Sequence, residues 1–499
     1  MKRWIPNLLF LTFCCWAQAA ERPNIVFILT DDQRDNSFSG MGHPWVKTPH
    51  VDQLLTQSTR FQNAYIAEPT CKPSRAAIYL GCHERVNHHG FSSTAKMNAA
   101  QWADSFPALL QKAGYRTGFT GKWHISNSKN LAFEDLFDYV EGHLGHGPFF
   151  FAQEDGSEVT TNFYYASKAI EFLESTDDAP FFLSVCLATP HGSKVAKMHK
   201  VLDEPSHLNP KLVGHPIYGG MYRDLTFPIP IDQRPDPYEH VPTSVRDQEK
   251  GRNTTYRYNY TEPMSREHHY RYFQMVTEID QMVSRIVQSL ESLGLDEKTI
   301  LIFGSDHGLL MGEYGMGGKG LVYDLSCKFP CFIYDPSSPQ SAKGQVRDEL
   351  VSSLDLSATI LDYAGLGKAE FMDGRSLKPL VQSAEPVESW RIGLFLENLY
   401  TGRDTPIQAG YVANGWKYIQ YHKAPHPYAE DDLNIRQNPP VFEQLFDLKS
   451  DPGEVQNLIA NPEAAEVLKQ LRHKTRESLE QLDQKRSAYH DQYLSGSSL

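Results

Sequence analysis

The sequence predicts an α/β fold, in which helices flank a mostly parallel central sheet, followed by a smaller C-terminal α+β subdomain. Four short apolar segments each end in polar residues, and helical patterns lie between them. Continuous apolar runs are typical of strands that are buried on both faces, as in a parallel sheet. The four segments are residues 25–29, 115–120, 181–187 and 299–303.

Helical patterns separate these strands along the chain. Residues 105–113 end at Gly114, and residues 162–174 precede the third strand. The longest pattern, residues 266–293, ends at Gly294 and carries an apolar stripe at helical spacing. The stripe consists of Met275, Val276, Ile279, Met282, Val283, Ile286, Val287 and Leu290. Ligands of such α/β sheets bind beyond the carboxyl ends of the strands.

The remaining segments define the domain organisation. Residues 192–265 lack periodicity, and so long a stretch inside a compact domain is usually a functional loop, here the expected wall of a substrate cleft. After about residue 365 the pattern changes to short strands, with Asn414-Gly415 as the turn of a hairpin. We therefore expect a catalytic domain at residues 21–365 and an α+β subdomain at 366–499. The expected elements of the second unit are strands at 392–396, 411–413, 416–421 and 445–448, and a helix at 462–482.

Residues 1–20 predict a cleaved secretory signal peptide. Lys2 and Arg3 precede the apolar run 8–16, and Ala17-Gln18-Ala19 places small residues at the cleavage site. The run is too short for a spanning helix, and Phe13 before Cys14 is a poor match to a lipoprotein cleavage site. We expect an exported protein, periplasmic or secreted, without a membrane anchor.

Charge and cysteine content narrow the function classes. A net charge of −13 over 499 residues argues against nucleic acid or an anionic membrane as partner. The mature chain holds an odd number of cysteines, which in an exported protein indicates a free thiol. Cys327 and Cys331 are the closest in sequence of the cysteines that could pair in a disulfide.

Three aspartates at the ends of predicted strands indicate a metal site. Asp31 and Asp32 follow the first strand, and Asp306 with His307 follows the last. The first pair alone would cap a turn as readily as bind an ion. Three uncompensated carboxylates at one sheet edge repel each other, and a cation resolves that repulsion. Oxygen ligands favour calcium or magnesium, although zinc also fits the composition.

Lysines and histidines in polar loops are further candidates. Lys122 and His124 follow the second strand, His191 follows the third, and Lys319 lies in a Gly-rich loop. Taken singly, such a lysine is more often solvated than a ligand, and such a histidine more often caps or packs. Convergence of most of them at the strand ends makes them candidates, and glycines allow close approach of an anion.

The central motif is Cys71-Lys72-Pro73-Ser74-Arg75. Pro73 suits the first turn of a helix that Gly81 can end, so Cys71 is expected just ahead of a helix N-terminus, where an anion is favoured. A lone cysteine there is usually structural. The whole pentapeptide, however, resembles the C-x-P-S-R signature of type I sulfatases, members of the alkaline phosphatase superfamily. Leu80-Gly81 stands where that family usually has Thr-Gly.

The resemblance spans nearly the whole mature chain and implies a set of roles. Cys71 is expected to be oxidised to formylglycine by a formylglycine-generating enzyme, with one divalent cation, preferably Ca²⁺, beside it. The implied catalytic residues are Cys71, Arg75, His124 and His191. The implied sulfate-binding residues are Lys122, His191 and Lys319. The implied metal ligands are Asp31, Asp32, Cys71, Asp306 and His307.

The implied function is hydrolysis of a sulfate ester with release of inorganic sulfate. The polar and aromatic loop region favours a sulfated poly- or oligosaccharide over a small aryl ester, with His88, His89, Arg223 and Arg252 as cleft candidates. One alternative on the same fold is a phosphomonoesterase or phosphonate ester hydrolase. Another alternative is a secreted carbohydrate-binding protein that has lost its catalytic activity. The complete set of nucleophile and metal-site residues argues against it.

Overall fold

The computed structural model describes residues 22–145, 147–148, 150–153, 155–191, 220–229, 245, 262–402 and 405–494. The expected signal peptide, most of the expected cleft wall and Arg252 lie outside these residues. Within the described segments, no helix combines the length and the apolar composition that a membrane crossing requires.

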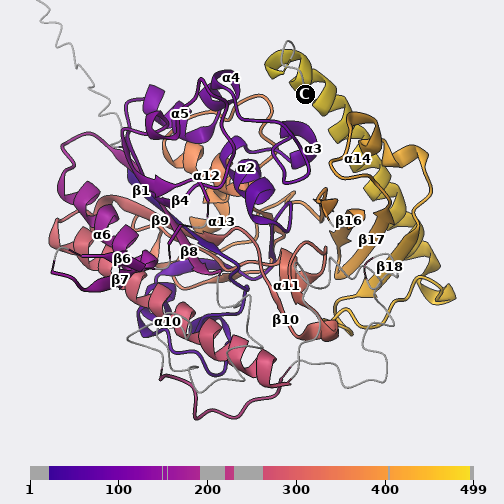
Figure 1. The fold of residues 1–499 in the computed structure, drawn as a ribbon, viewed down its shortest axis with the longest axis horizontal. Coiled ribbons are helices and arrows are strands. Elements are labelled where there is room, and N and C mark those ends of the chain that lie inside the picture. Colours follow the sequence, from indigo (N-terminus) through magenta and orange to yellow (C-terminus); the bar gives the residue numbers. More distant parts are fainter. Residues whose placement is uncertain are drawn as a thin grey trace, which may run out of the picture.

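An eight-stranded sheet forms the centre of the molecule (Figure 1). Five neighbouring strands, from β9 to β5 in the order below, run parallel. The other three form one edge, where β12 is antiparallel to both of its neighbours. The predicted mostly parallel sheet is confirmed. In order across the sheet the strands are β13 (Val346–Arg347), β2 (Ser58–Phe61), β12 (Cys331–Tyr334), β9 (Thr299–Ser305), β1 (Asn24–Asp31), β8 (Phe181–Pro190), β4 (Arg116–Lys122) and β5 (Tyr139–His143).

Strand β1 shows why helices cover both faces of the sheet. All of its residues are buried, and successive side chains point to opposite faces. Ile25 packs into one apolar layer and Val26 into another, so each face needs its own cover. The first layer includes α2 (Cys71–Leu80), α5 (Phe106–Lys112) and α12 (Leu354–Tyr363), and the second includes α6 (Thr161–Glu174) and α10 (Glu262–Ser292).

The smaller C-terminal domain contains an antiparallel sheet of four strands, as expected. Asn414 and Gly415 adopt φ angles of 52° and 81°, the left-handed pair that a tight hairpin turn requires. Helix α14 (Ala465–Tyr493) packs on β16 and β17, and it runs beyond the predicted end at residue 482. The strands are β15 (Gly393–Asn398), β16 (Ile407–Ala413), β17 (Trp416–His422) and β18 (Phe442–Asp447).

The carboxyl ends of the central parallel strands meet at one edge. Thr30 of β1 pairs with Ser305 of β9, and Asp31 pairs with Pro190 of β8. Residues that directly follow these three strands are therefore neighbours in space, although they lie far apart in the sequence.

Candidate active site

Helix α2 carries the cysteine motif into the interior. It begins at Cys71, with Thr70 in the N-cap position, and it ends at Gly81, whose φ is 71°. The helix starts earlier than Pro73 suggested, because Cys71 itself already belongs to the first turn. All residues of α2 are buried, so the thiol points into the protein rather than to the surface.

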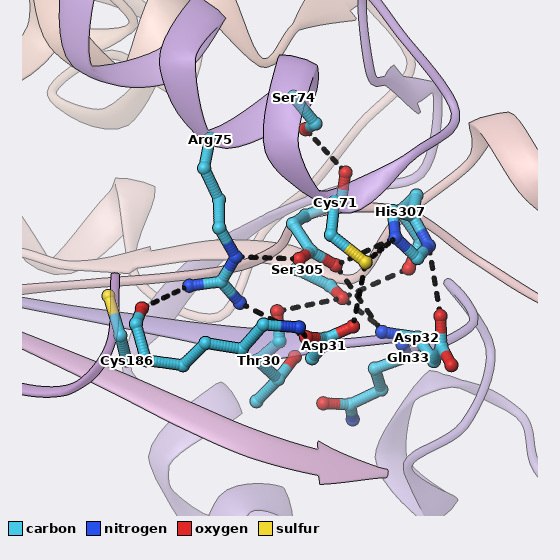
Figure 2. A network of polar contacts seen from close by, with 12 residues as sticks. Thr30, Asp31, Asp32, Gln33, Cys71, Ser74, Arg75, Cys186, Ser305 and His307 are labelled. Carbon is cyan, nitrogen blue, oxygen red and sulfur yellow. Dashed lines mark hydrogen bonds and ion pairs between the residues drawn. The ribbon is translucent and has the colours of Figure 1, made fainter. Parts of the chain in front are cut away.

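Asp31 and Asp32, at the end of β1, lie below this helix in Figure 2, and Asp306 directly follows β9. The backbone N–H of Asp32 donates to Asp306 Oδ1 at 3.3 Å, and that of Gln33 donates to Ser305 Oγ at 3.1 Å. These bonds join the turns after the two strands. They hold Asp31, Asp32 and Asp306 in one cluster, as the sequence predicted.

The Cys71 thiol lies at the centre of this cluster (Figure 2). Its Sγ lies 3.5 Å from Asp31 Oδ1, 3.2 Å from His307 Nε2 and 2.9 Å from Lys319 Nζ. A group at position 71 therefore contacts a carboxylate, an imidazole and an ammonium group at once. That is the environment of a reactive group rather than of a packing cysteine.

Each aspartate has a cationic partner. Arg75 Nε donates to Asp306 Oδ2 at 2.8 Å, and its guanidinium also lies 3.5 Å from Asp31. Lys122 donates to Asp31, and Lys319 donates to Asp32 at 2.7 Å. The expectation of three uncompensated carboxylates is therefore wrong, since three cations offset them.

The pKa values follow from burial and these partners. Burial would raise the pKa of Asp31, but the surrounding cations, Lys122 foremost, hold it well below its usual value. Burial would lower the pKa of His307, but the carboxylate of Asp306 raises it to about 9. Asp31 is therefore ionised, and the protonated form of the His307 imidazole is favoured.

The donor set fits a metal ion. His307 presents Nδ1 to Asp32 Oδ1 at 3.2 Å and Nε2 to Asp306 Oδ1 at 3.3 Å, so carboxylates face both ring nitrogens. A cation in their midst would satisfy all of these groups. One group of donors whose ligand atoms all lie within 4.8 Å of one another is Asp31, Cys71, Asp306 and His307, and a second is Asp31, Asp32 and His191.

The two candidate histidines lie at the same edge of the sheet. The backbone N–H of His191, which follows β8, donates to the Asp31 carbonyl at 2.9 Å, and its ring contributes to the low pKa of Asp31. His124 follows β4 in a left-handed conformation with φ of 63°. Its ring packs against Phe91, with 5.3 Å between ring centroids. Both rings are half-buried, so both can meet a ligand.

Two residues of the site, Ser74 and Gly121, have roles that the sequence did not predict. Ser74 Oγ donates to the Asp306 carbonyl, which explains why the motif needs a hydroxyl beside Arg75. Gly121 has φ of 103°, and a Cβ there would lie 2.0 Å from the Cys186 carbonyl oxygen. This glycine thus serves the packing of β4 on β8, rather than an anion, and so positions Lys122.

Other residues expected to line the cleft are buried or paired with another side chain. His88 and His89 are buried, so their rings do not line an open cleft. Arg223 is paired with Glu267, with 2.7 Å between Nη1 and Oε2.

The five described cysteines, Cys327 and Cys331 among them, are free thiols.

Three buried glutamates come from the segments next to the cysteine helix and from β15 of the C-terminal sheet. Glu68 Oε1 lies 3.0 Å from His83 Nδ1, and Glu397 Oε2 lies 2.9 Å from Arg85 Nε. The third, Glu84, accepts a hydrogen bond from the Tyr428 hydroxyl at 3.0 Å.

Glu84 gives folding stability a predictable pH dependence. Burial, and then Glu68 and Glu397, raise its pKa from 4.5 to about 8. The folded state keeps this proton where the unfolded chain has lost it. Its contribution to stability is therefore fully present below about pH 4.5 and is lost as the pH rises through about 8. We expect the wild-type Tm, followed by circular dichroism, to fall more steeply between about pH 5 and about pH 8 than that of Glu84→Gln.

The exposed Glu134 offers a matched control, because Glu134→Gln removes a carboxylate from the surface. Its Tm should follow the wild-type pH profile. Identical profiles for Glu84→Gln and wild type would contradict the assigned protonation.

Two family models match the chain. The model described as Sulfatase matches residues 23–366, and the model described as N-sulphoglucosamine sulphohydrolase, C-terminal, matches residues 312–481.

Relatives of similar length share about a quarter of their residues with this chain. An arylsulfatase of Clostridium perfringens is 26% identical, covering 90% of this chain and 93% of its own. An N-acetylglucosamine-6-O-sulfatase of Bacteroides thetaiotaomicron is 26% identical, with 93% and 88% covered. An ulvan-active sulfatase of Formosa agariphila is 25% identical, with 92% and 82% covered.

Solved structures share the fold. A structure in complex with D-glucosamine-2-N,6-O-disulfate, described as its substrate, superposes with a TM-score of 0.67 at 23% identity, over 95% of this chain and 99% of the other. A phosphonate monoester hydrolase of Agrobacterium radiobacter gives a TM-score of 0.69 at 21% identity, with 96% and 98% covered.

Proposed function

The chain belongs to the sulfatase family, and from this premise we propose that it releases inorganic sulfate from a sulfated poly- or oligosaccharide through a formylglycine made from Cys71. As a sulfatase it hydrolyses sulfate esters. The observation that carries the proposal is the position of the Cys71 thiol, in contact with Asp31, His307 and Lys319 in the first turn of α2. A formylglycine-generating enzyme would oxidise this residue during maturation.

We propose one divalent cation, Ca²⁺, bound by the aspartates and His307 together with residue 71. Calcium is preferred over zinc because oxygen ligands outnumber the single imidazole. When bound, the cation would lower the cost of an ionised hydroxyl at position 71 and offset charge on the sulfate group. The proposed ligand set is Asp31, Asp306 and His307 with the side chain at 71, which form one donor group, together with Asp32, which belongs to the group of Asp31 and His191.

The charge balance of the site favours a monoanionic ester. Arg75, Lys122 and Lys319 offset the three aspartates, and His307 is neutral when it binds a metal. A divalent cation then leaves two positive charges. A sulfate monoester and one deprotonated hydroxyl at position 71 carry two negative charges together, so the loaded site is neutral. A phosphate monoester dianion would leave the loaded site with one excess negative charge.

The remaining residues have distinct proposed roles. As a formylglycine hydrate, residue 71 would supply one hydroxyl that attacks sulfur and a second whose deprotonation expels sulfate. Lys122, Lys319 and His191 hold the sulfate oxygens, and His191 also gives a proton to the departing alcohol. His124 accepts the proton of the second hydroxyl. Arg75 is bound to Asp306, and it acts by fixing the aspartates and adding positive charge beside residue 71.

The proposal includes export. The expected signal peptide at residues 1–20 would direct the chain to the periplasm or out of the cell, where sulfated polysaccharides are degraded. Conversion of Cys71 would then remove its thiol and leave the four buried thiols of Cys82, Cys186, Cys327 and Cys331.

Matched esters test the reaction class. We expect catalytic efficiency on 4-nitrophenyl sulfate to exceed that on 4-nitrophenyl phosphate by at least about 100-fold, because of the charge balance. A phenylphosphonate monoester carries a single negative charge, as the sulfate does, and is therefore measured as a separate comparison. Sulfate release from tetrasaccharides of chondroitin sulfate, heparan sulfate, ulvan and carrageenan then tests which sugar carries the sulfate that the protein removes. A preference for phosphate or phosphonate would favour the alternative hydrolase, a serious candidate given the shared fold. Binding of these sugars without sulfate release, by material converted at residue 71, would favour a binding protein.

A further inference from the structure

An exposed aromatic side chain lies directly beside the proposed catalytic histidine. Phe91 is 39% exposed, and it is the only aromatic residue among the large, exposed apolar side chains of the described segments. Its ring meets that of His124 edge to face, with centroids 5.3 Å apart. A single exposed apolar side chain is ordinary on a protein surface, but this one stands beside a proposed catalytic residue, where it can contact a substrate.

Phe91 is part of a line of rings that leads away from the catalytic edge. Tyr400, which follows β15, lies 6.2 Å from Phe91 between centroids, and His426, which follows β17, lies 6.4 Å from Tyr400. Tyr400 is half-buried and His426 is exposed. We call His124, Phe91, Tyr400 and His426 the aromatic track. It begins in the large domain and continues on the C-terminal domain.

The loop that carries Phe91 is fixed on both sides. On one side Gly90 packs so closely on Glu84 that a Cβ would lie 1.5 Å from the carboxylate. On the other side Ser92 Oγ accepts the backbone N–H of Thr401 at 2.8 Å. This hydrogen bond ties the Phe91 loop to the residue that follows Tyr400. The track is therefore preorganised, which reduces the entropy cost of binding.

We propose that the aromatic track binds the sugar rings of the substrate by stacking, on the side of the scissile ester that carries the departing alcohol. This inference rests on the proposed function. Pyranose rings offer apolar C–H faces together with hydroxyl groups, and the track offers both kinds of partner. Phe91 supplies an apolar ring, whereas Tyr400 and His426 each combine a ring with a polar atom. A lipid tail would need a wider apolar patch than one exposed phenyl ring.

The track also assigns a role to the C-terminal domain. The first rings lie next to the catalytic edge, and the last two come from loops after β15 and β17. A glycan longer than one sugar would therefore contact both domains. A monosaccharide sulfate would reach only the first rings, so longer substrates are expected to gain most from the outer rings.

Three substitutions of Phe91 separate stacking from simple apolar contact. Phe91→Ala removes the ring, Phe91→Leu keeps apolar volume without an aromatic face, and Phe91→Trp keeps a ring. For the best sulfated tetrasaccharide of the panel, we expect KM to rise about tenfold in the first two variants, with kcat within about twofold, and to recover in the third. Val441→Ala, which truncates another exposed apolar side chain, should leave KM unchanged.

Tyr400→Ala tests the part of the aromatic track that the C-terminal domain supplies. It should raise KM more for the tetrasaccharide than for the sulfated monosaccharide of the same polymer. An unchanged KM in folded Phe91→Ala, or full recovery by Phe91→Leu, would overturn the stacking proposal.

These experiments distinguish failure of the aromatic-track proposal from failure of the proposed function. If wild type cleaves 4-nitrophenyl sulfate but none of the sugars, the sugar track is overturned while the sulfatase assignment stands. If wild type cleaves none of these esters, calorimetric titration with the four sulfated tetrasaccharides still tests whether the aromatic track binds sugar. Binding that Phe91→Ala weakens about tenfold supports the track, and equal or absent binding overturns it.

Discussion

Replacing Cys71 by alanine should reduce sulfate-ester turnover by about 10⁴-fold or more, because the proposed nucleophile is built from this side chain. The fold should tolerate the change. Residue 71 is the first residue of α2, where alanine is an acceptable helix former, and the Sγ atom is the only heavy atom removed. Loss of activity with an unchanged Tm would therefore locate the defect in the chemistry rather than in folding.

Mass spectrometry of the active protein supplies the independent measurement. The peptide that contains residue 71 should carry an aldehyde or its hydrate in place of the thiol. Cys71→Ser should be as inactive as the alanine variant in a host that cannot convert serine, while Cys82→Ser, at a buried free thiol outside the site, should retain turnover. Fully active protein with an unmodified thiol at position 71 would overturn the mechanism.

The strands that hold the site were predictable because their environment leaves a clear pattern. β1 and β9 are buried on both faces, so their sequences are almost continuously apolar. Strand β2 has the sequence STRF and only four residues, and it becomes a strand because β12 and β13 pair with it. Pairing partners far along the chain decide such a strand, and local sequence does not show them.

The members of the site were easier to predict than their partners. The aspartates directly follow predicted strands, so a parallel sheet brings them together. That Arg75 neutralises Asp306, 231 positions away, depends on side-chain directions across two elements. Phe91 has no signal in the sequence, because a single aromatic residue in a loop is ordinary. Its exposure beside His124 becomes visible only in the structure.

Calcium should stabilise the protein through the proposed metal site, and Asp32 is the residue best suited to test it. Asp306 is less suitable, since its removal would leave the fully buried Arg75 without its closest carboxylate, at a cost of about 3–5 kcal/mol. Asp32 pairs with the partly exposed Lys319. Its φ of 68° is left-handed, a conformation that asparagine also tolerates, so Asp32→Asn keeps the backbone and the shape.

We expect calcium added to chelator-treated wild type to raise the Tm by several degrees, because an ion that binds only the folded state stabilises it by mass action. Asp32→Asn should lose most of this shift and reduce turnover by about 10³-fold, whereas Asp178→Asn, at an exposed position, should behave as wild type. Zinc should restore less of both quantities if oxygen ligands dominate. The Tm shift measures binding without reference to catalysis. An equal calcium shift in Asp32→Asn would remove this residue from the ligand set, and full activity in verified metal-free protein would exclude a catalytic metal.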